Sequence, residues 1–127
     1  MNRQQAERRG RGAETFACWY LRLKGWRILA RRARIRGGEV DIVARRGRTL
    51  AFVEVKARSS DAAAAFALDD WRLRRVAVAA ERLAPRFMRD GDDVRIDALL
   101  IVPRRWPKHL ANVSAPRPRR SACCRFT

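Results

Sequence analysis

Three ionisable side chains on two neighbouring β-rich segments of this sequence have types and spacing suited to catalysis. Asp41 lies within residues 37–43, whereas Glu54 and Lys56 lie within residues 50–58. Side chains two residues apart on a strand point to the same face, so Glu54 and Lys56 share a face. Two carboxylates and an ammonium on one face are costly unless a metal ion or a phosphate interacts with them. In a strongly cationic chain this combination predicts metal-dependent cleavage of nucleic acid.

A two-residue turn between these segments would bring Asp41 close to Glu54. If Gly47 and Arg48 are its central residues, glycine comes first, as a type II′ turn requires, and Asp41 lies directly opposite Glu54. A turn centred on Arg46 and Gly47 would instead leave Glu54 diagonal to Asp41, still on the same face. Either register brings the carboxylates together, whereas a three-residue loop with a bulge would disturb them.

The net charge points to a polyanionic partner. Thirty Lys and Arg residues against 13 Asp and Glu residues give the 127-residue chain a charge of +17. The excess is almost entirely arginine, whose forked donors match phosphate oxygens. A preference for arginine codons in a GC-rich genome explains part of this excess but not so large a net imbalance. Nucleic acid is therefore the expected partner.

The remaining composition is that of one reduced globular domain. The hydrophobic fraction of 47% suits a single core, and no run of about 18 apolar residues predicts a membrane-spanning helix. Residues 1–11 are polar and basic, unlike a secretory signal. The cysteines and His109 lack zinc-ligand spacing, and the adjacent Cys123 and Cys124 have poor geometry for a disulfide. These features predict a cytoplasmic protein that does not bind membranes.

The spacing of apolar residues predicts the elements that position the ionisable groups. Residues 1–11 are expected to form a basic flexible arm, and residues 12–24 an amphipathic helix. The apolar stripe of this helix comprises Ala13, Phe16, Ala17, Tyr20 and Leu21. Strands are predicted over residues 26–35, 39–45 and 49–58.

A second helix and a last strand follow. The helix is predicted to begin at Asp69 or Asp70 and to end or kink at Pro85. Its expected apolar face comprises Leu73, Val76, Ala77, Ala80 and Leu83. Residues 59–68 fit either a loop or a short helix, and a strand is predicted over residues 94–102.

This order predicts an α/β fold, in which helices cover a mixed β-sheet in the order α-β-β-β-α-β. The second and third strands form the antiparallel hairpin, and the last strand can pair parallel to the third through a right-handed crossover. One domain is expected over residues 12–110. The Pro- and Arg-rich tail, residues 111–127, has no periodicity and is expected to pack poorly.

Several motifs occur in the order found in the YraN family, which the sequence resembles over about residues 10–110. The motifs are Gly12-Ala13-Glu14, Gly38-Glu39-Val40-Asp41-Ile42-Val43, Phe52-Val53-Glu54-Val55-Lys56-Ala57-Arg58, and Arg95-Ile96-Asp97, in which Ile replaces the family's Phe. That family is similar to the PD-(D/E)XK nuclease superfamily, which includes Holliday-junction resolvases and restriction endonucleases. The resemblance implies a restriction-endonuclease-like core and an endonuclease that acts on DNA in preference to RNA, with branched or structured DNA as a candidate substrate.

The resemblance also implies roles for individual residues. Asp41, Glu54 and Lys56 occupy the catalytic positions, with Asp41 and Glu54 binding Mg²⁺ or Mn²⁺. The backbone carbonyl of Val55 and the first-helix acid Glu14 are further candidate ligands, the latter if its helix packs across the sheet edge. Lys56 is expected to act electrostatically rather than as a general base, because it lies near two carboxylates and phosphate.

Other charged residues have competing interpretations. Glu39 either supports the metal site or forms an edge salt bridge, and Asp97 is interpreted as a structural partner of Arg95. The candidate phosphate contacts are Arg58, Arg72, Arg74 and Arg75. The alternative is that these arginines are solvent-exposed helix side chains without a role in binding. Arg72 stands where relatives usually carry a lysine.

Three alternatives to a nuclease remain open from the sequence, one of which is a small basic protein that binds RNA or a ribonucleoprotein through charge alone. The trio of Asp41, Glu54 and Lys56 also fits a cross-strand ion network on a solvated sheet face. A chain with the nuclease-like fold could equally bind nucleic acid without cleaving it. Junction-cutting relatives are often dimers, so a homodimer is a further expectation by analogy.

Overall fold

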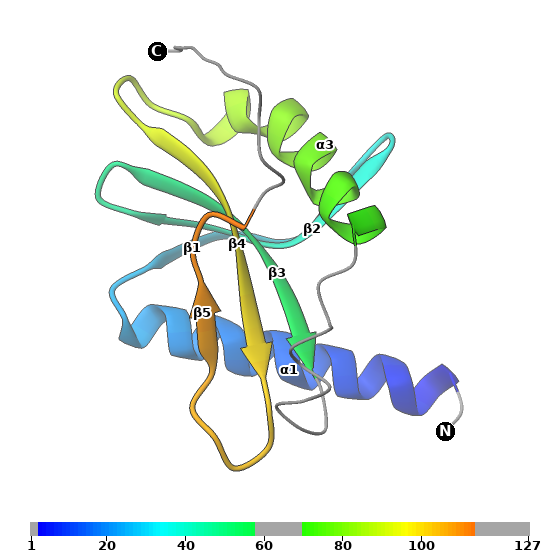
Figure 1. Ribbon diagram of the computed structural model, residues 1–127. Coiled ribbons are helices and arrows are strands. Elements are labelled where there is room, and N and C mark those ends of the chain that lie inside the picture. The colour runs from blue at the N-terminus through cyan, green and yellow to red at the C-terminus, as the bar shows by residue number, and fades with distance from the viewer. Residues whose placement is uncertain (1–2, 58–69, 114–127) are drawn as a thin grey trace.

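Figure 1 shows the computed structural model, which describes residues 3–57 and 70–113, with side chains from residues 12 and 72 onward in these two stretches. Its elements are α1 (Arg3–Leu23), β1 (Arg27–Ile35), β2 (Gly38–Arg46), β3 (Thr49–Ala57), α3 (Asp70–Phe87), β4 (Asp93–Ile101) and β5 (Lys108–Leu110). The strands form one mixed sheet in the order β1-β2-β3-β4-β5. Neither described helix is long and apolar enough to cross a membrane.

The strand pairing follows the predicted connections. β1, β2 and β3 are successive antiparallel neighbours, and β4 pairs parallel to β3 after the crossover through α3. The prediction of an α/β fold with a mixed sheet flanked by helices is therefore confirmed. The parallel pair needs the long connection because a tight turn joins only antiparallel strands.

The β2–β3 hairpin has the register that a Gly47-Arg48 turn predicts. Arg46 pairs with Thr49, and the pairing continues to Ile42 opposite Val53. Gly47 has a φ of 61°, which fits the first central position of a type II′ turn and which glycine adopts without steric cost. In this register the next facing residues are Asp41 and Glu54.

The two faces of the sheet are covered by different helices. Ala17 and Leu21 of α1 pack on Val53 and its neighbours in one apolar cluster, whereas Val76 and Leu83 of α3 pack with Phe52 in another. Successive strand residues point to opposite faces. Glu54 and Lys56, which share the face of Phe52, therefore lie on the side of the sheet that α3 covers.

The first helix differs from its prediction in length and in its buried face. It begins at Arg3 rather than Gly12, because most of residues 3–9 are good helix formers. Its buried residues are Glu14, Ala17, Cys18 and Leu21. Phe16 is 37% exposed, so the predicted stripe was wrong at this position; the small Ala17 and Cys18 allow the helix to pack closely on the sheet.

The second helix also buries a slightly different face. Ala77 is exposed and Ala79 is buried, contrary to the prediction. Ala79 packs where Gly38 leaves room, since a Cβ at Gly38 would lie 2.7 Å from the Ala79 nitrogen. The helix continues through Pro85 to Phe87, so the proline does not end it.

The sequence did not predict β5. This three-residue strand pairs antiparallel to β4, with His109 opposite Leu99. Three residues are too few to show a periodic pattern, and the pairing depends on backbone groups of β4. Beyond Val113 the predicted tail lies outside the described residues, as do residues 58–69, and Trp106 in the preceding loop is 77% exposed.

Candidate active site

Asp41 and Glu54 meet on the face of the sheet that α3 covers. Glu54 is only 1% exposed, and Asp41 is half-buried. The backbone N–H of Val55 donates a hydrogen bond of 2.8 Å to Oδ2 of Asp41. The Asp41 side chain thus accepts a strand N–H just beyond the last backbone pair of the hairpin, which holds its carboxylate beside Glu54.

The proximity of the two carboxyl groups perturbs the titration of Asp41. Burial, followed by the charge of Glu54, raises the pKa of Asp41 from an ordinary 3.8 to about 7. The hydrogen bond from Val55 and the charge of Arg72 oppose this rise without cancelling it. Near neutral pH the Asp41 carboxyl group is therefore only partly ionised.

Two cations converge on one oxygen of Glu54. Nζ of Lys56 lies 3.2 Å from Oε2, and Nε and Nη2 of Arg72 lie 2.9 and 2.8 Å from the same oxygen. Lys56 is largely buried, whereas the Arg72 side chain is 34% exposed. The structure therefore brings together Asp41, Glu54 and Lys56, and it adds Arg72 from α3 as a direct partner of Glu54.

The contact between Arg72 and Glu54 was not foreseen from the sequence. The sequence predicts a phosphate contact for Arg72, and no local spacing relates the start of α3 to the end of β3. Their meeting depends on how the crossover packs on the sheet. The only indication of a special role came from the resemblance, which implies a lysine at the position of Arg72.

The other three predicted phosphate contacts, Arg58, Arg74 and Arg75, differ in their surroundings. Nη2 of Arg75 lies 3.3 Å from Oε1 of Glu39, and both side chains are about one-third exposed. This ion pair agrees with the edge salt bridge proposed for Glu39. Arg74 is exposed on the helix surface, and Arg58 lies outside the described residues.

Glu14 is engaged by arginines of β1. Its Oε1 lies 2.8 Å from Nε of Arg32 and 3.6 Å from Nη2 of Arg31, although the residue is only 6% exposed. Across the described stretches, no three His, Cys, Asp or Glu side chains gather closely enough to hold a metal ion. The acidic set at the candidate site is therefore the pair of Asp41 and Glu54, and the role of Glu14 as a ligand stays a prediction.

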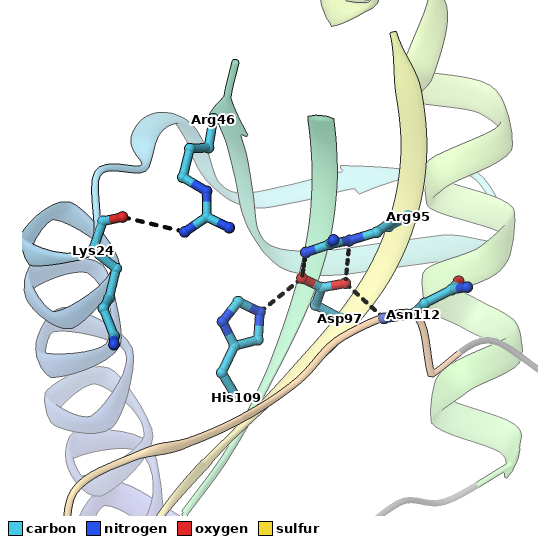
Figure 2. A network of polar contacts seen from close by, with 6 residues as sticks. All are labelled: Lys24, Arg46, Arg95, Asp97, His109 and Asn112. Atoms are coloured by element: carbon cyan, nitrogen blue, oxygen red, sulfur yellow. Dashed lines mark hydrogen bonds and ion pairs between the residues drawn. The ribbon is translucent and has the colours of Figure 1, made fainter. Parts of the chain in front are cut away.

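Asp97 has the structural role that the sequence suggested (Figure 2). It is fully buried, and Arg95 binds both of its oxygens, at 3.1 and 2.8 Å. Nε2 of His109 lies 2.7 Å from Oδ2, and the backbone N–H of Asn112 donates a bond of 2.9 Å to Oδ1. Burial alone would raise the pKa of Asp97, but these bonds outweigh it and hold the pKa below its usual value. The network fastens β5 to β4, and the sequence offered no pattern that related His109 to Asp97.

The raised pKa of Asp41 predicts a pH-dependent stability. The folded state binds the Asp41 proton more tightly than the unfolded chain does. The stabilising contribution of protonated Asp41 is therefore complete below about pH 4 and is lost as the pH rises through about 7. The melting temperature is therefore expected to fall by several degrees between about pH 5 and about pH 8. Asp41→Asn, which cannot ionise, should show a smaller fall in thermal denaturation.

A second group provides the control for this measurement. Hydrogen bonds from Arg45 lower the pKa of Asp92 to about 2, so its stabilising contribution is present above about pH 4 and is lost only in stronger acid. Asp92→Asn should therefore leave the slope between about pH 5 and about pH 8 unchanged. Equal slopes in Asp41→Asn and the wild type would contradict the assigned titration.

Fold and site together define an α/β protein with a mixed five-stranded sheet and a paired-carboxylate site under α3. The profile of the uncharacterised protein family UPF0102 matches residues 13–101. The chain belongs to this family, which confirms the resemblance to the YraN proteins found in the sequence.

Bacterial relatives match nearly the whole chain. A UPF0102 protein of Sphingopyxis alaskensis is 60% identical over 116 residues, which cover 91% of this chain and 100% of the relative. A UPF0102 protein of Rhizorhabdus wittichii is 58% identical over 114 residues, covering 89% and 97%. One of Parvibaculum lavamentivorans is 53% identical over 112 residues, covering 87% and 84%. The names of these relatives state the family and give no activity.

Proposed function

We propose that this protein is a metal-dependent endonuclease that hydrolyses phosphodiester bonds in DNA, including branched or structured DNA. The observation that carries the proposal is the meeting of Asp41 and Glu54, with Lys56 and Arg72 bound to Glu54. A solvated ion network does not account for this arrangement, because Glu54 and Lys56 are buried. The restriction-endonuclease-like identity of the core is part of the same proposal.

The donor set suits a small divalent cation. Mg²⁺ and Mn²⁺ prefer oxygen ligands, and Mg²⁺ keeps several waters when one or two carboxylates bind it. Burial and the charge of Glu54 favour a proton on Asp41, and a cation can replace that proton as the group that neutralises the repulsion between the two carboxyl groups. Asp41 and Glu54 would hold the ion, with the Val55 carbonyl as a further ligand. When bound, such an ion neutralises charge on a phosphate and acidifies a bound water.

The two basic residues have distinct parts in this proposal. The ammonium of Lys56 is held near the carboxylates by its ion pair with Glu54, which supports electrostatic stabilisation of the reacting phosphate. Arg72 orients Glu54 through a forked contact, and its partly exposed guanidinium has further donors for a phosphate oxygen. Arginine cannot act as a base, so its contribution is charge and position.

One observation favours a second candidate, a nucleic-acid-binding protein that retains this fold without cleavage. Oε2 of Glu54 already has the cations of Lys56 and Arg72 as partners. These two positive charges neutralise the acidic pair in part without any metal. In that case the site would stabilise the fold and contribute only to binding.

A panel of labelled DNA substrates tests the proposal against this alternative. Duplex, single-stranded, flap and four-way forms would be incubated with the full chain in Mg²⁺, in Mn²⁺ and in EDTA. The nuclease is expected to cleave at least one form only when the metal is present. Binding of all forms without cleavage in either metal would support the non-catalytic alternative and reject the nuclease.

Alanine substitutions on α3 test the phosphate contacts. Arg72→Ala and Arg75→Ala are each expected to weaken binding alike across DNA sequences and to reduce the slope of log affinity against log salt by about one. Arg82→Ala is the matched control, because Arg82 is exposed elsewhere on the same helix. Fluorescence anisotropy at several salt concentrations gives the slopes; unchanged slopes for Arg72→Ala and Arg75→Ala would reject this surface.

A further inference from the structure

The solvent side of α1 carries large apolar side chains. Phe16 is 37%, Trp19 51% and Leu23 60% exposed. Their spacing of three and four residues places them on one face, which we call the outer face of α1. Ala17 and Leu21 point to the opposite side and are buried against the sheet. A helix at the surface of a globular protein normally presents polar residues to water, so this apolar face indicates a partner.

The outer face displays aromatic rings. The rings of Phe16 and Trp19 stack on one another with a centroid distance of 6.0 Å and an interplanar angle of 21°. Beside them, the ring of Tyr20 lies 6.4 Å from that of Trp106, which is 77% exposed. Trp19 thus contacts one aromatic neighbour while half of its surface faces solvent.

Cations border the outer face on both sides. On the side of β1, Nη2 of Arg31 donates a bond of 3.1 Å to the Thr15 hydroxyl, and this arginine is 40% exposed. On the other side, Nζ of Lys24 lies 5.7 Å from the centre of the Tyr20 ring. Arg22 is exposed on the same helix. Exposed aromatic rings between cationic side chains are the arrangement that binds single-stranded nucleic acid.

We propose that the outer face of α1 binds a single-stranded segment of nucleic acid, whose bases stack on Trp19 and Phe16. The phosphates of that segment would be neutralised by Arg22, Lys24 and Arg31. The surface lies on the opposite side of the sheet from Asp41 and Glu54, which the α3 side carries. The inference rests on the proposed function only in treating the bound strand as part of the DNA substrate, such as the unpaired arm of a branched molecule.

Charge and area argue against a second copy of this chain as the occupant. Two copies meeting through α1 would each bring a chain of net charge +17, and their exposed arginines and lysines would repel. Given their exposed fractions and full areas of roughly 150–250 Å² each, the three apolar side chains offer roughly 300 Å². A stable dimer buries about 800 Å² on each partner. A polyanion satisfies the bordering cations, whereas a second copy does not.

Anisotropy measurements in EDTA test this inference without involving catalysis. The probes are a labelled oligothymidine of about 20 nucleotides and a duplex of the same length. Phe16→Ala/Trp19→Ala is expected to weaken oligothymidine binding about tenfold or more and duplex binding less than about twofold. Trp19→Phe should restore most of the affinity, because any aromatic ring offers a face for stacking. All three residue changes lie at exposed positions, so thermal melts should match the wild type.

The matched control is Leu23→Ala, which removes an exposed apolar side chain from the same face without removing a ring. Its oligothymidine affinity should stay within about twofold of the wild type. Equal affinities in the wild type and Phe16→Ala/Trp19→Ala would overturn the inference. So would sedimentation showing a wild-type dimer that this double variant dissociates, or binding to anionic phosphatidylserine vesicles that requires Trp19 while oligothymidine binding does not.

The two proposals fail in different ways. If the nuclease proposal is wrong, no metal-dependent cleavage occurs, yet the difference between Trp19 variants in EDTA remains. If the inference about α1 is wrong, oligothymidine affinity is the same in all variants, while cleavage still depends on metal and on Glu54. The binding and cleavage assays therefore test the surfaces separately.

Discussion

Glu54→Gln is expected to reduce Mg²⁺-dependent cleavage of DNA by at least about 100-fold. Even the mutation of a residue that only hydrogen-bonds to a metal ligand lowers metal affinity or activity by up to about 100-fold. The substitution keeps the shape of the side chain but removes one of two carboxylates at the site. DNA binding should be preserved or tightened, because a negative charge near the expected phosphates disappears. Cleavage assays and anisotropy on the same substrate measure the two effects.

Glu81→Gln provides the matched control, because Glu81 is exposed on α3 and contributes to no part of the candidate site. Its cleavage rate should equal that of the wild type. Calorimetry adds a second measurement: Glu54→Gln should lose Mg²⁺ uptake, whereas Lys56→Ala should retain uptake and lose cleavage. Full activity in folded Glu54→Gln would end the assignment of this carboxylate to the reaction.

Asp97→Ala is expected to lower the free energy of unfolding by about 3 kcal/mol, the lower end of the cost of removing one partner from a buried ion pair, because Arg95 is partly exposed. The substitution removes the acceptor that Arg95, His109 and the Asn112 amide share. Because these groups connect β4 with β5 and the residues after it, the end of the described chain should loosen first. Chemical denaturation gives the stability, and hydrogen exchange of the β5 amides gives the local effect.

Asp93→Ala is the control for this substitution, since Asp93 lies on the same strand but is exposed. Its stability should differ from the wild type by less than about 0.5 kcal/mol, as for other surface changes. His109→Ala should be milder than Asp97→Ala, because Asp97 keeps Arg95 as a partner. A stability of Asp97→Ala equal to that of Asp93→Ala would show that the network contributes little.

The candidate site was largely predictable because its acidic pair depends on local geometry. A glycine suited to a type II′ turn and a short loop determine which residues of β2 and β3 face each other. The period of two then places Glu54 and Lys56 on one side. Asp41, Glu54 and Lys56 meet as expected for these reasons, and the charge of the chain independently indicates a polyanion.

The first helix illustrates what apolar spacing leaves open. Phe16, Trp19 and Leu23 lie on one face of α1, and Ala17, Cys18 and Leu21 on the other, so the sequence contains two apolar stripes. Helical periodicity alone does not say which stripe meets the sheet. Close packing favours the smaller side chains, and the aromatic stripe is left facing solvent.

By itself, the sequence determined the order of the main strands and helices, the meeting of the acidic pair in either of two hairpin registers, and the cationic character, because each follows from local backbone preference or composition. Only the tertiary structure decided that Arg72 binds Glu54, that His109 and β5 are fastened through Asp97, and which side of α1 is buried. Those contacts join residues distant in the chain. Their distances depend on how the crossover helix, the sheet and the short last strand pack together, which no local pattern specifies.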